Sequence, residues 1–128
     1  MANPNIVNVT SILGGNAGWN LSSSATDTLM TVDSNVIVKL NSITVANVDG
    51  TNAADVSVFI SGLGTGATGV TTTGADADVY IAKTISVPAD ATLVLLNTPI
   101  YMMEGDILKG GASAASDLDL LVSYEVIS

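Results

Sequence analysis

Apolar and polar residues alternate along most of the chain, and this period-two pattern predicts β-strands. No segment of useful length shows the 3.6-residue period of an amphipathic helix. The predicted strands are Ile6–Ile12, Trp19–Leu21, Thr28–Val32, Val36–Val48, Asp55–Ser61, Val79–Val87, Thr92–Asn97, Ile100–Met103, Ile107–Lys109 and Asp117–Ile127. About eight to ten short antiparallel strands indicate an all-β fold, with residues 1–128 in a single β-sandwich or jelly-roll-like domain. We expect residues 1–16 to include an extended N-terminal arm.

The longest predicted strand, Val36–Val48, changes phase halfway along. Leu40 belongs to one alternating register, whereas Ile43 and Val45 take the opposite one. One extra residue in a strand turns every later side chain to the other face. We therefore expect a β-bulge or a corner near Asn41–Ser42.

Two similar small-residue stretches each lead into an alternating apolar run. They are "GTNAAD" at Gly50–Asp55 and "GASAAS" at Gly111–Ser116. Neither contains a catalytic pair or a cationic cradle, and glycine and small polar residues are typical of turns. We interpret them as corresponding hairpin loops in the two halves of a sandwich. The stretches "VPADAT" and "MEGD" predict two further tight turns.

The charge and the missing residue types limit the functions that the chain can have. It carries twelve Asp and Glu against three Lys, for a net charge of -9, which argues against nucleic acid and anionic membranes as partners. Cysteine and histidine are both absent, which removes the commonest general base and the commonest metal ligand. No nucleophile-plus-base arrangement is recognisable, so we predict a protein that is not an enzyme and has no cofactor.

Charged residues are scarce in this chain, and its mean hydropathy is high. They make up 12% of the sequence, where about 25% is usual, and the mean hydropathy is +0.53. The polar surface must then consist mainly of Ser, Thr and Asn. We expect such a surface to be buried against other subunits. The alternative explanation is a small Ala- and Val-rich core that raises the mean hydropathy.

The long connection at 61–78 is the first place where we expect contact with another molecule, because long loops are often functional. It is rich in Gly and Thr. Its "GTGATG" matches a dinucleotide-binding pattern, but no helical pattern follows, so a nucleotide site is not expected. Trp19, between Gly18 and Asn20, is either a core residue or an exposed contact. The interaction candidates are Trp19, Thr65, Thr68, Thr71 and Thr72.

Two Asp-x-Asp pairs are the only metal-binding candidates. Asp76 and Asp78 form one pair, and Asp117 and Asp119 form the other. Calcium prefers clustered oxygen ligands, but alternating Asp residues are also ordinary on a sheet surface. Neither pair has the spacing of a known calcium loop, so we predict no resident metal.

Three stretches together resemble small virion structural proteins of tailed phages, especially of marine cyanophages. They are "ITVANVDGTNAADVSVFI", "VYIAKTISVPADATLVLLNTPIYMMEGDILKGGASAASDLDLLV" and "SYEVIS". The resemblance covers 43–128 well and the first forty residues loosely, while 61–78 departs from it. The shared motifs are strands and turns, so the resemblance implies no active-site residues.

The resemblance implies a β-sandwich that decorates or cements a capsid. Its partners would be the major capsid protein or other virion proteins and further copies of itself, with a trimer favoured because a trimer fits a local threefold axis. Its location would be the virion, assembled in the host cytoplasm without a signal peptide. The alternatives are a tail, neck or fibre component, or a receptor- or carbohydrate-binding module.

Overall fold

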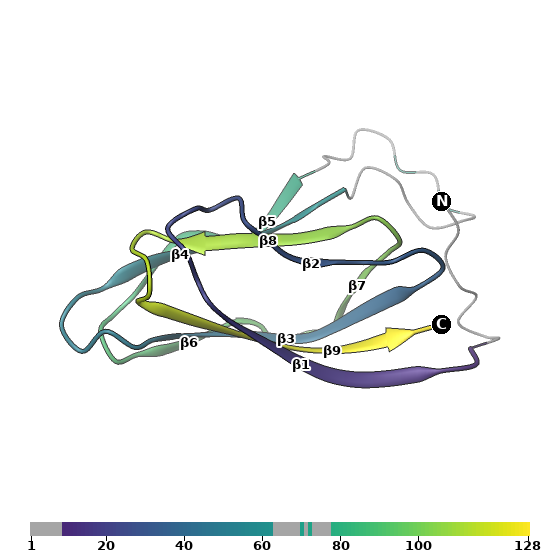
Figure 1. The fold of residues 1–128 in the computed structure, drawn as a ribbon, viewed down its shortest axis with the longest axis horizontal. Coiled ribbons are helices and arrows are strands. Elements are labelled where there is room, and N and C mark those ends of the chain that lie inside the picture. The colour runs from purple at the N-terminus through teal and green to yellow at the C-terminus, as the bar shows by residue number, and fades with distance from the viewer. Residues whose placement is uncertain (1–8, 63–69, 71, 73–77) are drawn as a thin grey trace.

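The computed structural model describes residues 9–62, 70, 72 and 78–128, which form two antiparallel β-sheets packed face to face (Figure 1). Sheet A contains, in spatial order, β1 (Ile12–Asn20), β9 (Leu118–Ile127), β3 (Ile37–Asn47) and β6 (Thr92–Leu96), with β7 (Ile100–Met102) also paired to β3. Sheet B contains β2 (Thr28–Thr31), β8 (Ile107–Ala112), β4 (Ala54–Ser61) and β5 (Asp78–Val87). The described residues thus confirm the predicted all-β sandwich.

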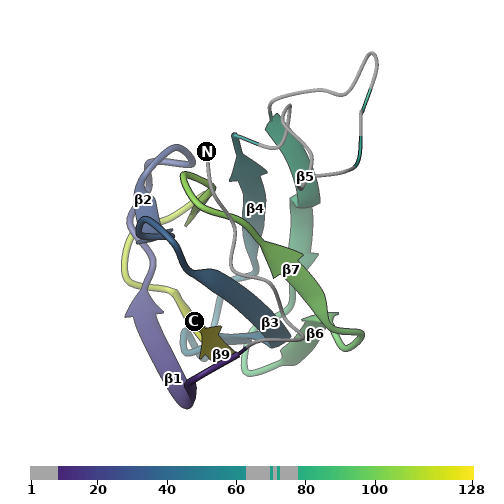
Figure 2. The same cartoon turned by 90° about the vertical axis from the view of Figure 1, so that its right-hand side faces the viewer.

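The strand order is that of a jelly roll. β6 and β7 pair with successive parts of β3 and act as one interrupted strand. Most consecutive strands lie in opposite sheets, so the chain passes repeatedly from one layer to the other (Figure 2). This alternation, with two four-stranded layers, is the jelly-roll arrangement.

The first strand differs from the prediction. Two short strands were expected on either side of a Gly-rich stretch, but the structure has one continuous strand, β1, paired along its whole length with β9. Pairing with β9 overrides the weak strand preference of glycine, and at Gly15 the ring of Tyr124 occupies the space where a Cβ atom would lie, 3.0 Å from it. Residues 12–16 therefore belong to sheet A rather than to the expected arm, and residues 1–8 lie outside the described residues.

The predicted irregularity in the longest strand is confirmed. The pairing of β3 with β9 shifts register between Leu40 and Ser42. Leu40 before the shift and Ile43 after it are both fully buried. The extra residue thus lets both halves of β3 direct their apolar side chains into the core.

The interpretation of the two small-residue stretches as hairpin loops was wrong. Each connects the two sheets: one joins β3 to β4, and the other, whose first two residues still belong to β8, leads to β9. The two connections lie side by side, since Val48 N donates to Asp117 O at 2.8 Å and Ser113 N donates to Asp55 O at 2.8 Å. Turn-forming residues mark where a strand ends but not which sheet receives the next one, because that depends on distant pairing.

The two other predicted turns are present. Ala91 N donates to Pro88 O at 3.1 Å, with Asp90 at φ 58°, and Asp106 N donates to Met103 O at 2.9 Å, with Gly105 at φ 86°. A residue with positive φ lets the chain reverse within four residues. Both turns also carry the chain from one sheet to the other.

The core lies between the two sheets, and one buried side-chain amide lies at its end. Its fully buried side chains include Leu40, Ile43, Val58, Leu108 and Leu120, drawn from both layers. At one end of this core, Asn47 Nδ2 donates to Asn52 O and Val87 O, both at 2.9 Å, and Asn47 Oδ1 accepts from Asp49 N at 2.8 Å. A buried polar group is tolerated when it is hydrogen-bonded in this way.

Replacing Gly111 by Ala should destabilise the fold by about 2 kcal/mol or more, because a Cβ atom there would lie 2.0 Å from the backbone oxygen of Ser24. Urea unfolding measures the change. The control is Gly14→Ala, where a Cβ atom meets nothing within 4 Å. That variant should stay within about 1 kcal/mol of the parent. Equal unfolding midpoints for the two variants would contradict the close packing at Gly111.

Candidate functional site

The outer face of sheet A carries small, mostly uncharged side chains in two of its rows, whereas in a third row Glu125 of β9 lies opposite Lys39 of β3. Its strand register places residues of β1, β9, β3 and β6 in two adjacent rows: Gly18, Leu121, Thr44 and Val94 in the first, and Asn20, Asp119, Ala46 and Thr92 in the second. Leu121 is 52% exposed and Val94 is 61% exposed. Apolar side chains thus stand among small neighbours on this face.

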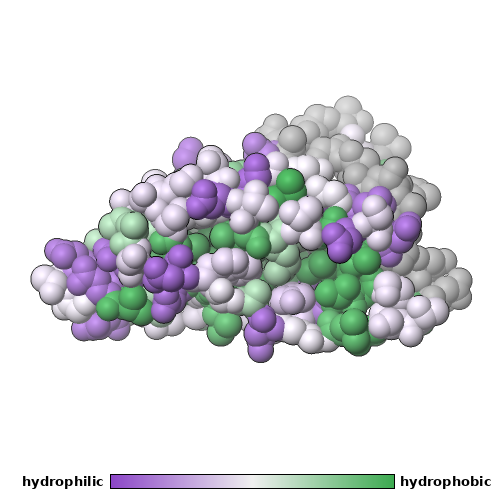
Figure 3. Space-filling view, in the orientation of Figure 1, coloured by the Kyte–Doolittle hydropathy of each residue, from purple (hydrophilic) through white to green (hydrophobic). Residues whose placement is uncertain are grey.

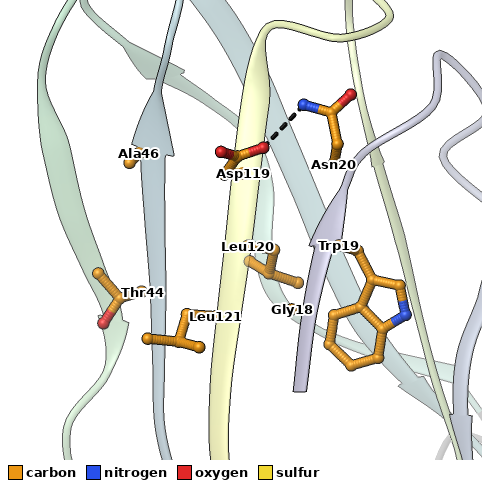
Figure 4. Close-up of a pocket in the computed structure, with 8 residues that line it drawn as sticks. All are labelled: Gly18, Trp19, Asn20, Thr44, Ala46, Asp119, Leu120 and Leu121. Atoms are coloured by element: carbon orange, nitrogen blue, oxygen red, sulfur yellow. Dashed lines mark hydrogen bonds between the residues drawn. The ribbon is translucent and has the colours of Figure 1, made fainter. Parts of the chain in front are cut away.

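A groove of about 430 Å³ crosses this face (Figure 4). It is hollow because Gly18, Thr44 and Ala46 have small side chains beside the larger Leu121. At its rim, Asn20 Nδ2 donates to Asp119 Oδ1 at 2.7 Å. Asp119 is the one ionisable side chain in the described lining. The groove therefore offers apolar contact and a few hydrogen bonds, which suits binding rather than acid–base chemistry.

Charged and strongly polar side chains gather at one end of the sandwich. Figure 3 shows hydrophilic residues at the left end, over the β3–β4 and β5–β6 connections. Asp49 and Asp90 meet there, since Asp90 N donates to Asp49 O at 3.2 Å. The backbone N–H of Thr51 and the side-chain amide of Asn52 hold the pKa of Asp49 below its usual value. Asp49 lies in the connection that directly follows β3, the strand whose Ala46 lines the groove.

Trp19 lies on the inward-facing side of β1. Its pairing partner is the buried Leu120, and its side chain packs against the core. In Figure 4 the indole extends past β1 on the side away from β9. Each of the two interpretations that the sequence left open fits in part, because Trp19 packs against the core and is also among the half-buried residues that line the groove.

The other interaction candidates come from the long connection. Thr72 is exposed. Thr65, Thr68, Thr71 and the glycine-rich "GTGATG" stretch lie outside the described residues. Contact of this connection with another molecule therefore stays a prediction.

The Asp pairs do not form a metal centre in the part of the chain that the structure describes. Asp78 is exposed at the start of β5, Asp117 precedes β9, and Asp119 is hydrogen-bonded to Asn20. Asp76 lies outside the described residues. Among the described positions, no group of three or more Asp and Glu side chains is placed to hold a metal ion.

Sequence reasoning missed one unusual carboxylate, Asp106. It is completely buried after the β7–β8 turn, where its Oδ2 accepts from Met103 N at 2.9 Å and its Oδ1 has no hydrogen-bond partner among the described residues. Burial raises its pKa above the usual value, and the Met103 hydrogen bond opposes this only in part. The turn sequence "EGD" marked a reversal but not the burial of its last side chain, which depends on how β8 packs.

Comparisons with known sequences assign no family. No protein-family model matches the chain, and no curated protein matches it. Within the described residues there is no helix with the length and apolarity needed to span a membrane.

The buried carboxyl group of Asp106 should make stability depend on pH. Because its folded pKa is raised, its favourable contribution is complete below the ordinary value of 3.8 and is lost as the pH rises through the folded pKa. Asp106→Asn should therefore gain stability relative to the parent as the pH rises across this range. Urea unfolding at a series of pH values measures the difference.

Asp49→Asn is the matched control for this experiment. The pKa of Asp49 is lowered, so its contribution is present above 3.8 and is lost as the pH falls through the folded pKa. Its variant should lose stability relative to the parent as the pH rises, the opposite trend. If the two variants show the same trend, the assignment of Asp106 as the buried, destabilised carboxylate is wrong.

Proposed function

We propose that the protein is a non-enzymatic structural subunit of a bacteriophage virion, one that decorates or cements the capsid by binding its lattice. The observation that carries this proposal is the part of the outer face of sheet A around the groove, where exposed apolar residues stand among small, mostly uncharged ones. This face has the composition of a surface that another protein covers.

The physical argument is the cost of removing such a face from water. Burying an unpaired charge is expensive, whereas burying apolar and small residues is favourable or cheap. Along the row through the groove, Leu121 and Val94 are separated by Thr44, without a charge between them. Full burial of exposed apolar side chains contributes about 1.5–3 kcal/mol each. The acidic end of the sandwich keeps the free subunit in solution before assembly.

The sequence resemblance to phage virion proteins supports the same proposal. The similar stretches supply the second half of β3, most of β4 and nearly all of the strands from β5 to β9, together with both small-residue connections between the sheets. The likeness therefore extends over most of the sandwich. A decoration protein would act by mass action, since each occupied lattice site stabilises the shell by the free energy of its contact.

The alternative of a carbohydrate-binding module has less support. It rested partly on Trp19 as an aromatic platform for a sugar, and Trp19 lines the groove but is half-buried against the core. The groove on sheet A has polar groups at its rim, but its lining presents no other aromatic residue. A tail, neck or fibre position is compatible with the same sheet face and differs from decoration in copy number.

Replacing Leu121 by Asp should reduce binding to capsids by at least about tenfold, because it places an unpaired charge at the centre of the proposed contact. Co-sedimentation with particles of the phage that encodes the chain, stripped of this protein, measures the binding. The control is Val79→Asp, which adds the same charge at an apolar position of β5 that is 44% exposed. The control should bind like the parent.

Two results would contradict the proposal. One is a parent protein that does not sediment with capsids. The other is a Leu121→Asp variant that binds as well as the Val79→Asp control. Counting copies in purified virions separates the positions, because a decoration protein is present in far larger numbers than a tail or fibre component.

A further inference from the structure

Among the described strands, β1 is the last of sheet A, and its own sequence lacks the usual protection of an edge. Edge strands present unpaired backbone groups, and proteins guard them with charged residues, proline or bulges. The nine residues of β1, "ILGGNAGWN", contain no charge and no proline, and they pair with β9 without a register shift. Figure 2 shows β1 at the margin of its sheet. Ile12 and Leu13 at its start are 60% and 63% exposed.

The other sheet margins are interrupted. β2 shifts register against β8, and β5 shifts twice against β4. β5 also carries Lys83 and the positive-φ residue Thr84. At the far side of sheet A, the strand is broken between β6 and β7, a gap that contains Pro99. Among the strands that the structure describes, β1 thus presents the longest regular edge.

The backbone groups that point outward from β1 can be assigned. Ser11 N donates to Ser128 O at 3.1 Å, and Ser128 N donates back to Ser11 O at 3.0 Å. At the other end, Leu21 N donates to Leu118 O at 2.8 Å. Hydrogen-bonded positions alternate in an antiparallel pair. The odd-numbered residues of β1 therefore face β9, and the even-numbered ones, with Asn16 at the centre, face outward.

Packing among the described residues does not require glycine at two positions of β1. A Cβ atom at Gly14 would meet nothing within 4 Å, and one at Gly18 would lie 3.6 Å from the backbone oxygen of Leu120, an ordinary contact. Neither is among the described glycines with positive φ, so the backbone does not require glycine there. Glycine inside a strand often marks the close approach of another backbone.

The sequence of β1 is nearly symmetric about Asn16. If a second β1 lies antiparallel to the first around this centre, the facing pairs are Leu13 with Trp19, Gly14 with Gly18, Gly15 with Ala17, and Asn16 with its own copy. Small residues then face small residues, and two large apolar residues face each other on the inward side. The outward-pointing backbone groups of the even-numbered residues also meet in hydrogen-bonded pairs in this register.

We propose that β1 pairs antiparallel with β1 of a second copy of this chain, about a twofold axis at Asn16, so that the two A sheets become one continuous sheet. The self-complementary order of side chains and the outward-pointing backbone groups favour pairing of this edge with an identical strand. A twofold contact presents the same patch from both subunits. This dimer forms in solution independently of any capsid, and it differs from the trimer that the resemblance to phage virion proteins implies.

Opposite charges at the axis test the register. In Asn16→Lys, two positive charges would face each other across the axis, and in Asn16→Glu two negative ones would. Each variant alone should dimerise at least about tenfold more weakly than the parent in sedimentation velocity over a dilution series. An equimolar mixture of the two should restore the dimer, because unlike charges then face each other. This rescue shows that both variants are folded.

Trp19 supplies a second readout, since it is the only tryptophan in the chain. In the proposed register Leu13 of the other copy covers it, so its emission should shift with dilution in the parent and with mixing in the variants. The matched control is Ser123→Lys, which places a charge on β9 directly beside Asn16 on the same face. It should leave the dimer unchanged because it is one strand away from the edge.

Three results would overturn the proposal. They are a parent protein that remains monomeric at every concentration, a dimer that both Asn16 variants leave intact, and a trimer that does not respond to charge at this position. Because none of these measurements uses capsids, a failure here leaves the capsid-binding experiment to be judged separately.

Discussion

The buried side chain of Asn47 holds the chain together where it passes from one sheet to the other. Its amide bonds the connection after β3 through Asn52 and Asp49, and it bonds the end of β5 through Val87. Most connections in this fold cross between the layers, and each crossing exposes backbone groups at the end of the core. At this end of the core Asn47 satisfies three such groups, on Asn52, Val87 and Asp49, so the connection after β3 can pack against the two apolar faces.

The connections and the groove differ in how many acidic residues they carry. Acidic residues are common in connections such as those of Asp49 and Asp90, while the groove on the outer face of sheet A has Asp119 as its one ionisable residue among those described. The face that carries the groove and the edge strand β1 belong to the same sheet, sheet A. Gly18 and Asn20 line the groove and also lie in the open strand β1. Pairing of two copies through β1 would bring their two grooves onto one continuous surface.

The sequence predicted the strands where local alternation is strong. The register shift near Asn41–Ser42 could be placed because Leu40 and Ile43 show the change of phase directly. β1 could not be recognised as one strand, because its glycines carry no alternation and its extended form depends on β9, about a hundred residues later. The burial of Asp106 escaped prediction for the same reason, since it depends on the packing of β8 and its turn.

The sequence by itself determined the all-β class, most strand positions, the turns and the absence of histidine and cysteine chemistry, because these follow from composition and from the order of neighbouring residues. The tertiary structure decided which sheet each strand joins, so the connections at Gly50 and Gly111 proved to link layers rather than to form hairpins. It also decided that Trp19 faces the core and that β1 ends its sheet. Alternation specifies the two faces of a strand, whereas its neighbours depend on pairing between residues far apart in the chain.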